Sequence, residues 1–345
     1  MSLKITIADI ANELQTTAAT VSRALNDHPS ISEKKKQLIR ETATRLNYKR
    51  NKIASSLRLG QSGIIGVIIP SAEINFFGSV VHGIESIANK SGFNILIYQS
   101  NESGESEAKG IETFLSSRVD GILVSIAKNT TEYSHFLAAK ASDIPIIFFD
   151  RSNDELGIHS VVIDDYKGAF MATEHLIEQG YKRIAHISGP EHLKIFKERL
   201  RGYSAALKVH NIEVDSELIY KGNVSIEAGK DAIDYFLKMK NPPDAVFAVE
   251  DFTALGAIKA LKENNIRIPE DFGVIGFANE SFGEHITPTL STIDQQTVEM
   301  GKVSFRLLMQ LMSNRQGDVL EQKIVLEPIP IFRNSSMKKV NSNII

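Results

Sequence analysis

The sequence predicts a small all-α domain at the N-terminus, followed by an α/β domain whose parallel sheets form two lobes. Three observations lead to this prediction. Residues 1–50 combine helical periodicity with a basic charge balance, residues 51–60 form a short connecting segment, and the remaining residues alternate apolar runs with helical stretches. A chain of 345 residues, 42% of them hydrophobic, is long enough for two or three domains.

The composition narrows the classes of protein to which the chain can belong. Cysteine is absent, which excludes disulfide bonds and thiolate metal sites. No run of about 18 apolar residues is present, so we predict no transmembrane helix and no membrane partner. Because residues 1–6 lack the basic, apolar and small-residue regions of a secretory signal, we expect a cytoplasmic protein.

Charge is distributed unevenly along the chain. Residues 1–60 hold 11 Lys and Arg against 5 Asp and Glu, whereas residues 61–345 hold 28 against 37. A basic N-terminal segment on an acidic body favours contact with a polyanion such as nucleic acid. The alternative is a solvated helix face, because Lys34, Lys35 and Lys36 supply much of the excess.

Three short helices are expected within residues 1–50. Thr6 is a candidate N-cap, with Asp9 as its capping-box partner, and an apolar face follows at Ile7, Ile10, Ala11 and Leu14. After a three-residue turn, Thr17 can cap a second helix over residues 18–25, which gives helix-turn-helix geometry. Ser32 can cap a third helix, whose apolar residues complete the core with Leu38, Ile39, Ala43 and Leu46.

The second helix is the candidate DNA-reading element. In a helix-turn-helix, this helix places its N-terminal side chains in the major groove. Small residues allow close approach, the methyl groups of Ala and Thr suit the thymine methyl, and Arg can pair with guanine. Three short helices also occur in protein-binding modules, but DNA is favoured by the exposed set Thr17, Ala18, Ala19, Thr20, Ser22 and Arg23.

Three short sequence motifs lie at residues 7–11, 20–26 and 46–48, and Asn51 follows them. Together they resemble the headpiece of the lactose-repressor (LacI) family of bacterial transcription regulators. The family usually carries Gly-Val-Ser in the turn, where this chain has Gln15-Thr16-Thr17. The resemblance implies that bases are read by Thr17, Ala18, Ala19 and Arg23. It also implies that the phosphate backbone is held by Asn26, Tyr48 and Asn51.

Residues 51–60 have helical propensity but are too short for a stable free helix. The resemblance implies a hinge helix that folds on DNA, pairs with its dimer mate and inserts an apolar wedge into the minor groove. Leu57 matches that wedge, and Ala54 lies one turn earlier on the same face. The alternative is that Leu57 packs on the body of the protein.

The body alternates strand-like runs with helical stretches, as in residues 77–89, 166–179 and 251–264. This alternation predicts parallel sheets covered by helices on both faces. Because nine strand runs exceed one six-strand sheet, we expect two lobes. The runs are 64–69, 93–98, 121–126, 145–150, 161–163, 183–188, 218–221, 245–249 and 273–277.

Several phrases of the body also match the family, at residues 119–122, 180–185, 187–190, 199–203, 254–257, 274–277 and 288–293. The body therefore resembles the family's sensor domain, which shares the fold of periplasmic sugar-binding proteins. The resemblance implies crossovers near residues 163–164, 291–293 and 327–328. One lobe would then hold residues 61–163 and 291–328, and the other would hold residues 164–290 and 329–345.

The resemblance also implies a homodimer that reads a near-palindromic operator. The tail at residues 338–345 is too short for a heptad repeat, so we expect a dimer rather than a coiled-coil tetramer. Candidates for the dimer face are Val80, Val81, Ile84 and Ile87, for which core packing is the alternative.

In open parallel sheets, ligands bind beyond the carboxyl ends of the strands, which here places a site between the lobes. The candidates for effector contacts are Asn75, Phe76, Phe77, Asp150, Arg199, Glu250 and Asn279. The resemblance implies that Phe76 and Phe77 stack on the ligand and that Arg199, at the opening of a helix, clamps it. The alternatives are aromatic residues in the core and charges in ion pairs that close the lobes.

Three positions depart from the pattern of sugar-sensing members. Glu250-Asp251 stands where they often carry Asn-Asp, Ala278 where they often carry Asp, and Val224 where an aromatic residue is common. The usual set of groups for binding sugar hydroxyls is therefore incomplete. We expect a carbohydrate-like effector, with an uncommon sugar, a sugar acid, a sugar phosphate or another compound all open. Regulation by a protein partner is a further alternative.

Enzyme motifs are missing from the sequence. No glycine-rich dinucleotide motif follows the first strand, no Walker-type or nucleophile-elbow motif is present, and the nine His residues show no metal-ligand spacing. We predict no catalytic residues, no cofactor and no metal. The expected function is a DNA-binding transcription regulator, a repressor, whose affinity for its operator a small ligand modulates. The alternative is a solute-binding module without specific DNA recognition, such as a transport-type binding protein, against which the basic headpiece argues.

Overall fold

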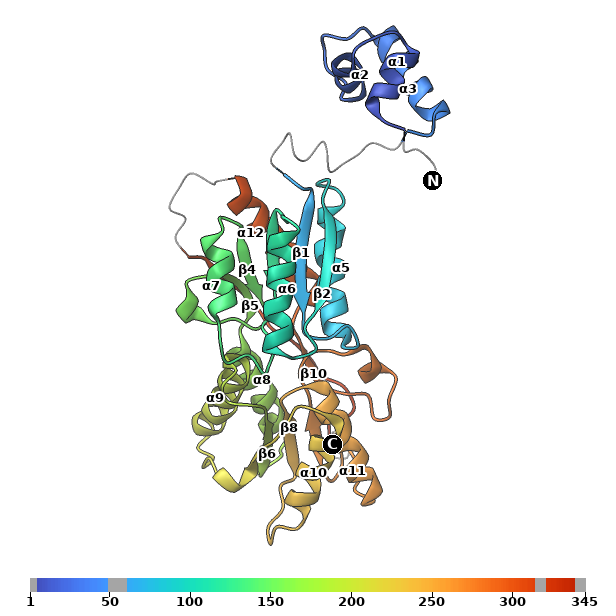
Figure 1. The fold of residues 1–345 in the computed structure, drawn as a ribbon. Helices are drawn as coiled ribbons and strands as arrows, with labels where there is room; N and C mark the ends of the chain where they lie inside the picture. The colour runs from blue at the N-terminus through green and yellow to red at the C-terminus, as the bar shows by residue number, and fades with distance from the viewer. Residues whose placement is uncertain (1–4, 49–60, 314–320, 339–345) are drawn as a thin grey trace. The chain divides into compact units, whose positions relative to one another are not determined.

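The computed structural model describes residues 5–48, 61–313 and 321–338 (Figure 1). The chain divides into two compact units, Met1–Ser62 and Gly63–Ile345. No helix among the described residues combines the length and apolar character that a membrane span requires.

The first unit is a bundle of three helices: α1 (Ile7–Glu13), α2 (Ala18–Leu25) and α3 (Glu33–Arg45). The predicted capping box is confirmed, since Asp9 Oδ2 accepts hydrogen bonds from the Thr6 backbone N–H and hydroxyl, each at 2.7 Å. The prediction that Leu38 belongs to the core is wrong. Leu38 is 51% exposed, whereas its neighbour Ile39 is fully buried, because adjacent helical residues point in different directions.

The N-lobe, as we name the upper part of the second unit in Figure 1, contains a six-stranded parallel sheet in the order β11-β5-β4-β3-β1-β2. Alternate residues face opposite helix layers, as Val67 and Ile68 do. One layer is α5 (Asn75–Ala88) with α12 (Thr297–Ser313), and the other is α6 (Gly104–Ser116) with α7 (Ser134–Ala141). The strands are β1 (Ile64–Ile69), β2 (Asn94–Gln99), β3 (Gly121–Val124), β4 (Ile146–Phe149), β5 (His159–Ile163) and β11 (Lys323–Leu326).

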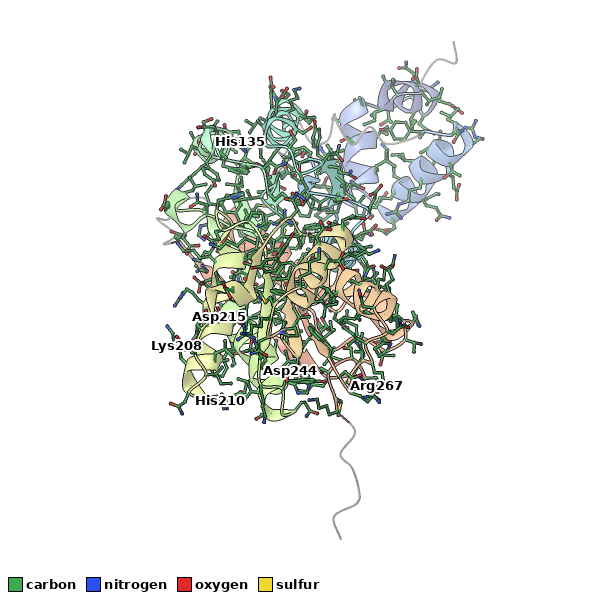
Figure 2. All side chains as sticks on the ribbon, turned by 90° about the horizontal axis from the view of Figure 1, so that it is seen from below. His135, Lys208, His210, Asp215, Asp244 and Arg267 are labelled. Carbon is green, nitrogen blue, oxygen red and sulfur yellow. The ribbon has the colours of Figure 1, made fainter. Side chains whose placement is uncertain are left out.

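The C-lobe, the lower part of the same unit, contains a four-stranded parallel sheet in the order β7-β6-β8-β9. Asp244, labelled in Figure 2, anchors the start of one strand, since its Oδ1 accepts the Arg183 backbone N–H at 2.8 Å. The strands are β6 (Ile184–Ser188), β7 (Ile219–Lys221), β8 (Ala245–Ala248) and β9 (Gly273–Ile275). The helices are α8 (Asp165–Glu178), α9 (Lys194–Val209), α10 (Ile226–Leu237) and α11 (Asp251–Glu263).

Two short strands lie between the lobes. β10 (Thr292–Asp294) pairs antiparallel with β12 (Ile329–Ile331), and β12 follows β11 after two residues. The chain therefore leaves the N-lobe after β5 and returns to it through β10, before α12 and β11 complete that lobe. A third passage, after β11, takes the chain back to the C-lobe, where the Val274 N–H donates to the Ser335 carbonyl at 2.8 Å.

The predicted dimer face is wrong in part. Val80 and Ile84 are fully buried, because α5 packs against both the sheet and α12. Val81 and Ile87 are partly buried against the same core.

Helices α10 and α11 approach each other through two glycines. A Cβ added at Gly256 would lie 1.9 Å from the Ile226 carbonyl oxygen, and a Cβ added at Gly229 would lie 2.0 Å from the Thr253 carbonyl oxygen. Both distances are well inside van der Waals contact. The two backbones therefore touch directly, and no side chain separates them at this crossing.

Candidate functional site

Helix α2 presents small side chains and a guanidinium group on its outer face. Thr17, Ala18, Ala19 and Arg23 are all exposed. The Thr17 hydroxyl accepts the Thr20 backbone N–H at 3.2 Å, so it caps the helix as well as facing outward. Within the described residues, the Arg23 guanidinium has no hydrogen bond or ion pair. This face therefore combines small exposed side chains with an exposed guanidinium group.

The residues expected to contact phosphate differ in their exposure. The Asn26 side chain is exposed and its Nδ2 donates to the Ser22 carbonyl at 2.8 Å. Tyr48 is partly buried against the headpiece core. Asn51 and the predicted wedge residues Ala54 and Leu57 lie outside the described residues.

The second candidate site is a cavity of about 40 Å³ between the lobes. Of the seven predicted effector contacts, five line it: Phe76, Phe77, Asp150, Arg199 and Glu250. Asn75 and Asn279 do not. Asn75 is exposed, and the Asn279 Nδ2 donates to Asp294 at 3.0 Å. Four further lining residues also follow strand ends in the sequence but were not among the seven: Arg151, Asp251, Ala278 and Glu280. The sequence analysis missed the remaining ones, namely Ile74, Ile195, Phe196, Phe252 and Gln295.

Arg199 lies inside α9, which begins at Lys194, rather than at the opening of a helix. Its side chain is buried and fully occupied. Nε donates to Asp165 Oδ1 at 2.8 Å, and one Nη donates to the Val249 carbonyl at 2.7 Å. The guanidinium also lies 3.7 Å from the centre of the Phe277 ring. A ligand that bonded to Arg199 would have to share or replace these contacts.

Aromatic rings form the apolar part of the wall. Phe76 and Phe77 are buried and pack edge to face, with ring centres 5.1 Å apart. The alternative of core packing holds for both, and both also line the cavity. Their stacking on a ligand stays a prediction. Phe196 lies one turn before Arg199 on α9, a spacing that could have indicated it from the sequence.

The polar part of the wall is rich in carboxylates. Burial raises the pKa of Glu250 to about 7, although the guanidinium groups of Arg151 and Arg199 oppose the shift. Burial likewise raises the pKa of Asp251 to about 7, opposed by its hydrogen bond from Thr292. The pKa of Asp150 is also raised by burial. The crevice therefore holds acids that are costly to ionise without a cation nearby.

Polar contacts join the two lobes around the crevice. The Phe76 backbone N–H, at the start of α5, donates to Glu280 Oε1 of the C-lobe at 3.2 Å. On the other side, Lys194 of α9 forms an ion pair with Asp154, and Lys323 of β11 donates to the same carboxylate at 2.9 Å. The lobes are thus closed on each other in this structure.

A larger groove of about 850 Å³ adjoins the inner cavity. Asp150, Arg151 and Ile195 line both spaces, so they form the partition between them. Among the described residues, no cluster of three or more His, Asp or Glu side chains could hold a metal ion. The site is therefore one of carboxylates, guanidinium groups and aromatic rings.

Two family models match the chain. The model described as "Bacterial regulatory proteins, lacI family" matches residues 6–51. The model described as "Periplasmic binding proteins and sugar binding domain of LacI family" matches residues 62–330, most of the chain.

Named relatives match along nearly their whole length. The chain is 31% identical over 337 residues to the HTH-type transcriptional repressor PurR of Vibrio atlanticus (strain LGP32), covering 97% of this chain and 99% of the relative. It is 31% identical over 336 residues to catabolite control protein A of Priestia megaterium, covering 97% and 100%.

Solved structures agree with these relatives. The transcription regulator CcpA of Lactococcus lactis is 32% identical, with a TM-score of 0.73 over 79% of this chain and 98% of that one. The Lac repressor dimer bound to operator and the anti-inducer ONPF has a TM-score of 0.87, with 97% of this chain and 100% of that one covered. At 24% identity, the latter comparison shows the fold alone.

Proposed function

The chain belongs to the LacI family of bacterial regulatory proteins and is a DNA-binding transcription regulator, and we propose a separate role for each of its two candidate sites. The headpiece recognises an operator, and the crevice between the lobes binds the effector that modulates this recognition. The relatives are regulators rather than enzymes, so we propose no enzymatic role. We also propose that the protein acts in the cytoplasm, where its DNA lies.

The observation that carries the proposal for the headpiece is the outer face of α2. Thr17, Ala18 and Ala19 are small enough for the helix to lie deep in the major groove, where their methyl groups meet thymine methyls. Arg23 has no partner among the described residues and is free to pair with a guanine. Asn26, Tyr48 and Asn51 would hold the backbone and fix the register of α2.

We propose that residues 51–60 contact the central part of the operator. In a dimer, two such segments meet at the centre of a near-palindrome, where Leu57 would enter the minor groove and Ala54 would pack beside it. An apolar wedge unstacks a base step and bends the duplex, so flexible central steps should be favoured.

The effector would couple to DNA through the lobes. A ligand in the crevice contacts Asp150 of the N-lobe and Glu250 of the C-lobe, so it changes how the lobes lie against each other. The chain passes from the N-lobe to the C-lobe and back before α12 and β11 complete the N-lobe. Rotation of one lobe against the other therefore strains the segments that cross between them. DNA affinity and effector affinity must then change by the same factor.

Selection of DNA from a random pool tests the proposal, with full-length protein at one fixed salt concentration. We expect recovery of a near-palindrome with a flexible central step. Recovery of no motif, with binding that only follows salt concentration, would contradict the proposal and favour a solute-binding module. Repeating the selection with sugars and other metabolites tests the effector, which should change recovery of the same motif.

A further inference from the structure

Arg151 holds a central position in the interlobe crevice. Its side chain lines both the inner cavity and the outer groove. One Nη donates to Glu102 Oε2 at 2.8 Å, and the guanidinium lies 5.7 Å from the centre of the Phe77 ring. Nε is buried without a hydrogen-bond partner, at 3.9 Å from Asp150 Oδ2. A positive charge of the protein itself thus stands between the two spaces.

Carboxylates outnumber guanidinium groups in the wall of the inner cavity. Asp150, Glu250, Asp251 and Glu280 face Arg151 and Arg199. Each guanidinium already has a carboxylate outside that set of four, because Arg151 pairs with Glu102 and Arg199 pairs with Asp165. The cavity wall therefore holds more acidic groups than its two guanidinium groups can pair with.

Two of the four carboxylates have structural partners. Asp251 accepts the Glu280 backbone N–H and the Thr292 hydroxyl, each at 2.7 Å. Glu280 accepts the Phe76 backbone N–H across the lobes. The bonds to Asp251 fix the start of α11, and the bond to Glu280 joins the two lobes. Both acids therefore have a structural role.

The other two carboxylates, Asp150 and Glu250, come one from each lobe. Among the described residues, no hydrogen bond to the Glu250 carboxylate is found. Asp150 is 6% exposed, with the Ser125 hydroxyl beside it and the Arg151 Nε at 3.9 Å from its carboxylate. Because a partly buried carboxylate without a donor is costly, Glu250 marks a place where a donor from outside is expected.

We infer that the effector carries a positive charge, as a protonated amine or an amidine, and that this charge takes the place now held by the Arg151 guanidinium between Asp150 and Glu250. The inference rests on the proposed function of the crevice and adds the chemical class of its ligand. A cation would bind one carboxylate from each lobe, so it would hold the lobes closed. A sugar acid or sugar phosphate would instead place its negative charge beside these acidic groups and oppose their ionisation.

The aromatic wall fits the same class of ligand. Phe77 already lies under the Arg151 guanidinium, and Phe252 and Phe196 line the cavity with it. Ring faces attract cations, most strongly where water is excluded. An ammonium or amidinium group that replaced the guanidinium would keep this contact.

Entry of the ligand requires Arg151 to move. The inner cavity, about 40 Å³, is far below the few hundred Å³ of an ordinary ligand pocket. The outer groove, about 850 Å³, shares Asp150, Arg151 and Ile195 with the lining of that cavity. Rotation of the long Arg151 side chain would join the two spaces and release its charge from the crevice.

The test uses full-length Arg151→Ala, which removes the guanidinium and leaves its space. Methylguanidinium chloride is titrated calorimetrically at constant ionic strength, with methylurea as a neutral molecule of the same shape. We expect methylguanidinium to bind the variant at least about tenfold more tightly than it binds the wild type, and more tightly than methylurea does. Equal binding of the charged and neutral probes would overturn the inference.

The double variant Arg151→Ala/Glu250→Gln locates the binding. We expect the preference for the charged probe to fall about tenfold, whereas Arg151→Ala/Arg267→Ala, which removes an exposed cation paired with Asp271 outside both spaces, should leave it unchanged. An unchanged preference in the double variant would overturn the inference. If Arg151→Ala fails to fold, Arg151→Met keeps the apolar stem, and the same titration applies.

Operator binding separates this inference from the proposed function. Binding of methylguanidinium in the crevice of Arg151→Ala, without any change in operator affinity, would support the charge inference and contradict the proposed coupling. A sugar phosphate that released operator from the wild type, and failed to do so in Glu250→Gln, would support the coupling and overturn the charge inference.

Discussion

The Glu250 carboxylate illustrates how burial sets a charge state at the scale of one residue. Its pKa is about 7, because burial outweighs the guanidinium groups of Arg151 and Arg199, and the neighbouring acids Asp251 and Glu280 act in the same direction as burial. The folded chain therefore binds this proton more tightly than the unfolded chain, whose Glu has a pKa near 4.5. The stabilisation is complete below that value and is lost as pH rises through about 7.

We predict that Glu250→Gln removes this loss. The free energy of unfolding of the wild type, relative to the variant, should fall between about pH 5 and about pH 8, by on the order of 1–3 kcal/mol. Denaturant unfolding of both proteins at several pH values measures the difference, in which the other titrating groups cancel. A difference that does not depend on pH would show that Glu250 is ionised throughout.

Arg23 is the residue on which base recognition is expected to depend most. Its replacement by Ala should weaken binding of the selected operator by about 1–3 kcal/mol and relax the preference at one base pair. Titration of the operator and of its single-base variants measures both effects. Lys35→Ala, a change on the charged face of α3, is the control and should weaken all sequences alike. Unchanged operator affinity for both Arg23→Ala and Leu57→Gly would contradict the assigned contacts.

Helix α11 shows at the scale of elements how closely backbones can pack. A Cβ at Gly256 would meet the Ile226 carbonyl of α10 at 1.9 Å, and a backbone cannot move aside as a flexible side chain can. Gly256→Ala should therefore lower the free energy of unfolding by about 1–3 kcal/mol or more. Gly78→Ala is the matched control, because Gly78 lies in α5 with nothing within 4 Å of an added Cβ. It should stabilise the protein by about 0.5–1 kcal/mol.

The sequence predicted the elements whose burial or capping produces a clear local pattern. Central strands such as β1 and β4 are buried on both faces, so they appear as continuous apolar runs. Helix α2 was predicted with its observed ends, because Thr17 caps it and the apolar face ends at Leu25. β11 was missed, since it lies at the sheet edge and its residues alternate between exposed and half-buried.

The sequence could predict those crevice residues that lie just beyond the end of a strand. Asp150 directly follows β4 and Glu250 comes two residues after β8, so each lies beyond the carboxyl end of a strand of its own sheet. The role of Arg151 was not predictable, because its partner Glu102 lies 49 positions upstream, in a different loop. No local pattern indicates such a pair. Asn279 follows β9 as expected, but its amide bonds to Asp294 and Arg333 instead of the cavity.

The two lobes form one molecule whose closure depends on a few polar contacts. Asp154 of the N-lobe is shared by Lys194 of the C-lobe and Lys323 of β11. All three are exposed enough for the contact to contribute only about 0–1 kcal/mol. Asp154→Asn should leave the thermal midpoint nearly unchanged but increase the fraction of open molecules. Small-angle scattering measures this as a larger radius of gyration, and an unchanged radius would contradict it.

Asp271→Asn is the control for this prediction. Asp271 pairs with Arg267 in the C-lobe, so removing its charge disturbs an exposed ion pair without touching the contact between lobes. It should leave the radius of gyration as in the wild type. High salt should act on the wild type in the same direction as Asp154→Asn, because exposed ion pairs are screened.

The order of the crossovers has a consequence for the protein during its synthesis. α12 and β11, which complete the N-lobe, and Ser335, which pairs with Val274 in the C-lobe, all lie near the C-terminus. Neither lobe can be completed until residues 297–335 have left the ribosome. The three headpiece helices, by contrast, are complete by Arg45. A nascent chain interrupted before α12 would carry a finished DNA-reading unit without the completed domain that modulates it.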